Sequence, residues 1–168
     1  MGIDADASAM SEVSRRAARS TARGELPNTL FIAAAAEEMP GPLAGTADSI
    51  TIALPWSSLL RAVLDPGSAA FTRISATAKP CAQIEVLVSS TGRDAASEGL
   101  LLDESFAASL AKRYAAAGVR VKEYRPASAA DVVRVSSGWG QRLGVPERRQ
   151  AWIYRLRVSC APDTSLRT

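Results

Sequence analysis

The stretch ITIALPWSSLL, residues 50–60, decides the fold class. Its first part, Ile50–Leu54, is rich in β-branched and apolar residues, which is typical of a strand. Pro55 and Trp56 then end the strand, and residues 57–64 predict a short helix. In an open parallel sheet, ligands bind outside the carboxyl ends of the strands. The pattern therefore predicts that the Trp56 indole lies beside a bound ligand.

A second indole occurs in a similar setting. Trp139 lies in SSGWG, residues 136–140, a polar segment flanked by glycine. Two planar rings presented from loops could clamp a flat substrate such as a nucleobase. Taken singly, a tryptophan after a strand more often packs in the core. Trp152 keeps that structural interpretation, because it lies on the apolar side of an alternating final strand.

Predicted strands and helices alternate along the rest of the chain. Strands are expected at 2–4, 30–36, 50–54, 84–88, 119–124 and 152–158. Helices are expected at 6–19, 57–64, 68–78, between Asp103 and Gly118, and over part of 129–143. The continuous apolar run at 30–36 predicts a strand covered by helices on both faces, and the run at 84–88 predicts another buried strand. This order indicates a doubly wound α/β sheet, and 168 residues suit one domain over 1–168.

Composition and charge exclude several classes of function. The chain contains no histidine, which removes Ser–His triads and most zinc sites, and no metal site is expected. The net charge is only +3, but residues 134–168 hold seven arginines against two acids. A second cluster comprises Arg15, Arg16, Arg19 and Arg23. Arginine suits bidentate phosphate contacts, so the clusters suggest a polyanionic partner, the alternative being solvated surface faces.

Cysteine usage and hydropathy bear on the compartment. Cys81 and Cys160 lack CxxC spacing, and the sequence shows neither a signal peptide nor an apolar run long enough to span a bilayer. We expect a cytoplasmic monomer with no membrane partner.

Five short motifs occur in an order that resembles one family. They are Ile3–Asp6, Leu26–Asn28, Ala34–Glu37, Pro55–Arg61 and Trp139–Leu143. The ordered set covers nearly the whole chain and is similar to the aminoglycoside-resistance 16S rRNA (adenine-N1)-methyltransferases, which modify a decoding-site adenine. The resemblance implies a class I, Rossmann-like methyltransferase fold and S-adenosylmethionine as methyl donor. It also implies 16S rRNA in the 30S subunit as substrate and aminoglycoside resistance as the result.

The resemblance also assigns roles to individual residues. The cofactor is expected to contact Asp4, Ala36, Glu37, Leu54 and Ser58, with Asp4 on the ribose hydroxyls and the Ala36–Glu37 step beside the adenine. The flipped target base is expected between Trp56 and Trp139, with Ser137 and Ser58 lining the same pocket. RNA contacts are expected from Arg23, Arg142, Arg148 and Arg149.

The residues by themselves leave other interpretations open. An acid such as Asp4 at the end of a second strand also binds the ribose of nicotinamide cofactors. Glu37 and Glu38 could form a solvated helix start. Ser58 and Ser137 could simply cap helices.

The sequence departs from the family pattern in two places. The family's first strand and its Gly-x-Gly loop precede the point at which this chain starts, so we expect a domain that is incomplete at its N-terminus. We favour an incomplete gene model over a fragment with impaired cofactor binding. The alternatives to the rRNA methyltransferase function are a non-catalytic RNA-binding remnant and a methyltransferase of a small aromatic metabolite. Ser57 stands where the family usually has glycine.

The expected reaction suits a chain without histidine. Adenine N1 carries an in-plane lone pair, so attack on a sulfonium methyl needs alignment but no prior deprotonation. The base must first leave its stack, which costs a few kcal/mol, and stacking on aromatic faces offsets this by about 1–3 kcal/mol per base. The methylated base is cationic, and an indole face attracts cations.

Overall fold

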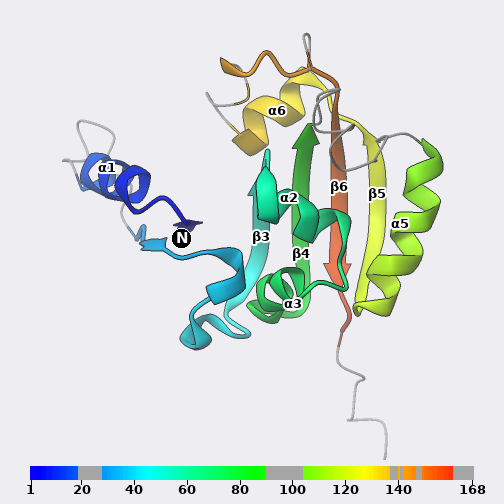
Figure 1. Cartoon of the computed structure of the whole chain (residues 1–168), viewed down its shortest axis with the longest axis horizontal. Coiled ribbons are helices and arrows are strands. Elements are labelled where there is room, and N and C mark those ends of the chain that lie inside the picture. The colour runs from blue at the N-terminus through cyan, green and yellow to red at the C-terminus, as the bar shows by residue number, and fades with distance from the viewer. Residues whose placement is uncertain (19–27, 90–103, 137–139, 141, 147–148, 161–168) are drawn as a thin grey trace, which may run out of the picture.

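The computed structural model describes residues 1–18, 28–89, 104–136, 140, 142–146 and 149–160 (Figure 1). In chain order its elements are β1 (Gly2–Asp4), α1 (Ala7–Ala17), β2 (Phe31–Ala33), the 3-10 turns η2 (Ala36–Glu38) and η3 (Gly41–Leu43), β3 (Ala47–Ala53), α2 (Ser57–Leu64), α3 (Ala69–Ala76), β4 (Ala78–Ser89), α5 (Glu104–Ala116), β5 (Val119–Pro126), α6 (Ala129–Ser136) and β6 (Ala151–Val158). Strands and helices alternate, as the sequence predicts.

The strands form two sheets. A four-stranded sheet has the order β3-β4-β6-β5, in which β3 and β4 are parallel and β6 runs antiparallel to both of its neighbours. The antiparallel closing strand expected at 152–158 is thereby confirmed. A separate two-stranded parallel sheet joins β1 to β2 and pairs Asp4 with Ala33. The mixed α/β architecture with a central sheet agrees with the Rossmann-like class expected from the sequence.

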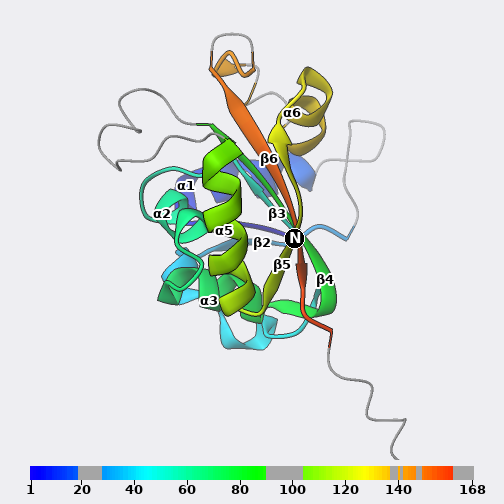
Figure 2. The same cartoon turned by 90° about the vertical axis from the view of Figure 1, so that its right-hand side faces the viewer.

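Helices α2, α3 and α5 cover one face of the four-stranded sheet, and α6 lies on the other (Figure 2). The larger core cluster lies under the three helices and includes Phe71, Leu110 and Tyr114. Phe71 and Tyr114 meet edge to face with ring centroids 5.2 Å apart. The buried Tyr114 hydroxyl donates to the Val63 carbonyl at 2.7 Å, so this polar atom enters the core with a partner.

The second core cluster is smaller and lies beneath α6. It joins Leu54, Leu87, Val132 and Ile153. Only the upper part of this sheet face is covered in this way. Further down the strands the residues of the same face are polar, such as Gln83 and Arg157, which the register places opposite one another.

Trp152 has the structural role that its position in an alternating strand predicts. It is 4% exposed, and its ring stacks on Tyr124 with centroids 4.7 Å apart. Along the same strand Arg155 and Arg157 are exposed, whereas Tyr154 and Leu156 are buried. The alternation of β6 is therefore confirmed at the level of individual side chains.

The prediction for residues 30–36 is wrong in extent and in burial. The strand β2 covers only Phe31–Ala33, its first two residues are half-buried and Ala33 is exposed. Among the described residues β2 pairs only with β1, and Ala34 N donates to the Asp4 carbonyl just beyond the strand. An apolar run shows only that the residues are nonpolar. It does not show whether helices cover the strand on one face or on both, so it could not distinguish a half-buried strand from a fully buried one. Asp103, at which the helix expected before Gly118 starts, lies outside the described residues.

A disulfide that the sequence did not predict joins Cys81 and Cys160, which are 79 positions apart. The Cα atoms are 4.5 Å apart. The register explains their meeting, because Gln83 of β4 pairs with Arg157 of β6 and the two strands run antiparallel. The bond links the segment after β6 to the first half of β4.

Candidate functional site

The connection between β3 and α2 presents the principal candidate residue. Leu54 follows β3 with a φ of 49°, and its N–H donates to the Leu87 carbonyl at 2.7 Å. The chain then turns through the buried Pro55 to Trp56, which is extended and occupies the N-cap position of α2. Trp56 is 80% exposed. An indole held outside the carboxyl end of a parallel strand is free to stack on a planar ligand.

The neighbouring residues define what this connection offers. Ser58 is exposed in the first turn of α2, so its hydroxyl is available to a ligand. Leu54 is only 7% exposed and packs in the cluster under α6, so a cofactor there could meet its backbone but not its side chain. Ser57 has a φ of 53°, a conformation that favours glycine. Glycine, which the resemblance to the family implies at this position, adopts such a φ without strain.

The ends of β1 and β2 carry the candidate cofactor residues. Asp4 is exposed at the end of β1, and its Oδ1 accepts a hydrogen bond from Asp6 N at 2.9 Å. Its second carboxylate oxygen can accept a hydrogen bond from a ribose hydroxyl. Ala36 is half-buried against the main core in η2, and Glu37 is exposed beside it. Since β1 and β2 are parallel, these residues lie at the same end of the small sheet.

The predicted RNA-contacting residues are described only in part. Arg142 is exposed and Arg149 is half-buried, both between α6 and β6. The other predicted site residues of this group, Arg23, Ser137, Trp139 and Arg148, lie outside the described residues. The structure thus groups Leu54, Trp56 and Ser58 in one connection and leaves the second half of the proposed clamp as a prediction.

A network of ion pairs anchors α6 to the sheet, and sequence reasoning missed it. Asp131 is 5% exposed and accepts from Arg125 Nη1 at 2.6 Å and from Ser128 N at 3.0 Å. The Arg125 hydrogen bond is the main reason that the pKa of Asp131 lies well below its usual range. Arg134 and Arg155 converge on Glu85, and the Arg134 hydrogen bond is the chief cause lowering the pKa of that carboxyl. The Asp131 partners are close in the sequence, but Glu85 lies 49 and 70 positions from Arg134 and Arg155, and no local sequence signal joins residues that far apart.

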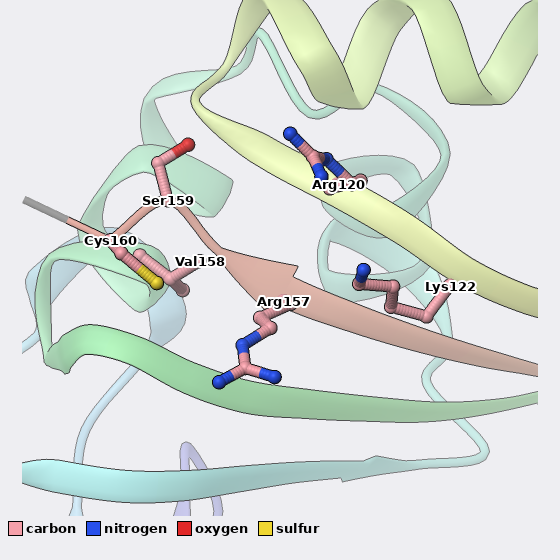
Figure 3. Close-up of a pocket in the computed structure, with 6 residues that line it drawn as sticks. All are labelled: Arg120, Lys122, Arg157, Val158, Ser159 and Cys160. Carbon is pink, nitrogen blue, oxygen red and sulfur yellow. The ribbon is translucent and has the colours of Figure 1, made fainter.

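Three further basic residues gather on the part of the sheet face that α6 leaves open. Arg120, Lys122 and Arg157 line a depression of about 460 Å³ together with residues 158–160 (Figure 3). A neighbouring depression lies over Gln83 and Glu85. Neither depression is lined by Trp56 or Ser58. The VRVK alternation at residues 119–122 was the signal that could have identified this basic surface.

Metal and membrane features were also sought in the described part of the chain. No group of three or more histidine, cysteine or acidic side chains is arranged there to hold a metal ion. None of the helices described is long and apolar enough to cross a bilayer.

Comparison with known proteins identifies the family. Residues 1–158 match the model of the family described as NpmA, 16S rRNA (adenine(1408)-N(1))-methyltransferase. The enzyme of that name from Streptoalloteichus hindustanus is 32% identical over 152 residues, covering 85% of this chain and 68% of the relative. The aminoglycoside resistance methyltransferase NpmB1 superposes with a TM-score of 0.75 at 35% identity, over 94% of this chain and 74% of that structure.

A second solved structure carries cofactor information. A variant of the 16S rRNA (adenine(1408)-N(1))-methyltransferase from Catenulisporales acidiphilia, solved with the cosubstrate SAM, superposes with a TM-score of 0.79. It is 28% identical, and the match covers 96% of this chain and 75% of that one. The family match spans most of the sequence and agrees with the class I methyltransferase fold. The chain belongs to the 16S rRNA (adenine(1408)-N(1))-methyltransferase family.

Proposed function

We propose that this protein transfers a methyl group from S-adenosylmethionine to N1 of the adenine in 16S rRNA for which its family is named, and so gives resistance to aminoglycosides. The family match over residues 1–158 carries this proposal. It favours an rRNA substrate over a small aromatic metabolite and an enzyme over a remnant that only binds RNA. The substrate we propose is the 16S rRNA within the 30S subunit.

The exposed indole of Trp56 is proposed to hold the target base. A base drawn out of an RNA helix loses its stacking partners, and a free aromatic face replaces them. Trp56 needs no rearrangement to do this, because it is 80% exposed on the loop that follows β3. As N1 is methylated the ring becomes cationic, and the face of the indole stabilises that charge. Trp139 is proposed as the second face, and Ser137 as a polar group beside it.

The residues at the ends of β1 and β2 suit part of an S-adenosylmethionine site. The exposed Asp4 carboxylate would accept hydrogen bonds from the ribose hydroxyls, and the Ala36–Glu37 step would lie against the adenine. Ser58, which is exposed, and the Leu54 backbone would complete the site. The bound cofactor supplies an electrophilic methyl group, and the chain's own task is to align N1 with it.

The RNA contacts and the compartment complete the proposal. Arg142 and Arg149 are proposed to bind phosphates around the target nucleotide, together with Arg23 and Arg148. The site of action is the cytoplasm, where ribosomal subunits are found. Cytosolic thiol systems would there hold Cys81 and Cys160 reduced. The pairing of β4 with β6 keeps the two side chains adjacent even without the bond.

The decisive experiment replaces Trp56 by alanine and measures methylation of purified 30S subunits. Loss of about 1–3 kcal/mol of stacking predicts a rate lower by roughly 5- to 150-fold. The melting temperature should stay the same, because the side chain packs on little else. Trp56→Phe, which keeps an aromatic face, is the matched control and should retain more activity than the alanine variant.

The product is identified by nucleoside mass spectrometry and by the block that an N1 methyl group places on reverse transcription. Absence of methyladenine with the parental protein would refute the proposed activity. Equal rates for the parental protein and Trp56→Ala would refute only the role given to the indole.

A further inference from the structure

The lower part of the open sheet face holds a group of cations that the proposed methyl-transfer site does not use. Arg120 and Lys122 extend from β5 and Arg157 from β6, and all three line one depression (Figure 3). All three are exposed. The cluster and Trp56 lie toward opposite ends of the sheet. Trp56 follows the end of β3, where Ala53 pairs with Leu87 of β4, whereas Arg157 of β6 pairs with Gln83 of β4. Four residues of strand separate the two levels, about 13 Å.

The acids of this face are already taken by other arginines. Glu123 accepts from Arg125 Nε and from Arg155 Nη1, both at 2.6 Å. Glu85 is bonded to Arg134 and Arg155. Among the residues that the structure describes, none forms an ion pair with Arg120, Lys122 or Arg157. Within the described part of the chain, the three positive charges of the cluster are therefore uncompensated.

This arrangement does not serve the stability of the fold. Arg120 and Arg157 are direct cross-strand partners in the register of β5 and β6. Like charges placed directly opposite one another destabilise a sheet. A bound anion removes that repulsion. The two guanidinium groups and the ammonium group, which lie on adjacent strands, can donate hydrogen bonds to the oxygens of phosphodiesters.

The shape of the surface indicates which anion binds there. The three cations lie along two strands on an open face, and the adjoining depression continues over Arg155 and Arg134 toward α6. A row of exposed charges follows a polymer backbone, whereas a free phosphate or nucleotide is usually enclosed and held by backbone N–H groups. Charge complementarity thus favours an RNA backbone as the occupant.

We infer that Arg120, Lys122 and Arg157 form a second RNA-binding surface, which contacts phosphates remote from the nucleotide to be methylated. This inference rests on the proposed function, since it concerns the same RNA substrate. The surface supplies affinity and orientation without reading sequence, because phosphate contacts carry no base information. Its contribution depends strongly on salt, because each contacted phosphate releases counterions.

The test compares two double variants that remove the same number of charges. Arg120→Gln with Arg157→Gln removes two cations from the cluster. Arg73→Gln with Lys112→Gln is the control, since both residues are exposed on helices α3 and α5, which cover the other face. Binding to purified 30S subunits is measured without cofactor from 50 to 200 mM KCl. The slope of log affinity against log salt should fall by about 1.4–1.8 for the cluster variant, at 0.7–0.9 for each lost phosphate contact.

The control pair should change the slope by much less than the cluster variant. Equal slopes for the two double variants would overturn the inference. Methylation by the parental protein is measured in parallel, so that the two proposals fail separately: an unchanged slope with intact methylation removes only the second surface. A smaller slope without any methylation supports the surface and refutes the activity. The melting temperature of the cluster variant should match or exceed that of the parental protein, because this variant loses a like-charge pair. The melting temperature of the control variant should stay close to the parental value, since its substitutions are on the surface.

Discussion

The two faces of the four-stranded sheet differ in the kinds of side chain that stabilise them. The face under α2, α3 and α5 is closed by large apolar side chains such as Phe71 and Leu110, both completely buried. The face that α6 covers only in part combines a smaller apolar cluster with ion pairs around Asp131 and Glu85, and then opens onto the exposed cations of the basic depression. Because net stability comes mainly from apolar burial, the first face can hold the fold. The exposed part of the second face is therefore not needed for stability and can bind a ligand.

The largest effect expected from this contrast comes from two adjacent residues of β4. Ile84 is fully buried under the helices, and Gln83 is exposed on the other face. Ile84→Ala should lower the free energy of unfolding by about 2–5 kcal/mol, through lost transfer energy and the cavity left behind. Gln83→Ala should change it by less than about 0.5 kcal/mol. Urea unfolding at pH 7 measures both, and similar losses for the two variants would remove the distinction between the faces.

The next effect concerns the ion pairs that attach α6 to the sheet. Asp131→Asn keeps the shape of the side chain but removes the charge that Arg125 and Arg134 share. We expect a loss of about 2–3 kcal/mol at pH 7, because Asp131 is buried while its arginine partners remain partly exposed. The measurement is urea unfolding of the variant and the parental protein.

The same variant should alter the pH dependence of stability. The pKa values of Asp131 and Glu85 are lowered in the folded state. Their contribution is therefore fully present above the unfolded-state values near pH 4 and is lost as the pH falls through the lower folded-state values. The parental protein should lose stability below about pH 4, and Asp131→Asn should lose less over that range. Parallel curves for the two proteins would contradict this account of the network.

The smallest effect is expected at the edge where the two faces meet. Ser57 has a φ of 53°. This conformation is strained for a residue with a side chain but not for glycine. Ser57→Gly should stabilise the fold by about 0.5–1 kcal/mol. Ser58→Gly, one residue further into α2, should destabilise it by about 0.5 kcal/mol, because glycine disfavours helix. Thermal unfolding of the pair gives opposite signs if the left-handed conformation of Ser57 is correct.

Local sequence patterns predicted two kinds of element: helices, whose hydrogen-bond partners are close along the chain, and strands with one apolar and one polar side. The expected helix at residues 57–64 is α2 as observed, and the alternation of Trp152, Tyr154 and Leu156 gave both the strand β6 and its buried side. The apolar run at 30–36 failed, because polarity does not say how many layers cover a strand. For the site, the sequence placed Trp56, Ser58 and Asp4 at strand ends. Their roles toward cofactor and RNA remain predictions.

Residue order alone determined the α/β class and the position of a tryptophan directly after β3, because strand and helix periods and the proline-tryptophan step are local. The motifs together also determined the family. Tertiary structure alone decided that Glu85 meets Arg134 and Arg155, that Arg120 lies opposite Arg157, and that Leu54 is buried while Trp56 is not. These outcomes depend on the register between strands that are distant in the sequence. Register is set by packing and hydrogen bonding across the whole sheet.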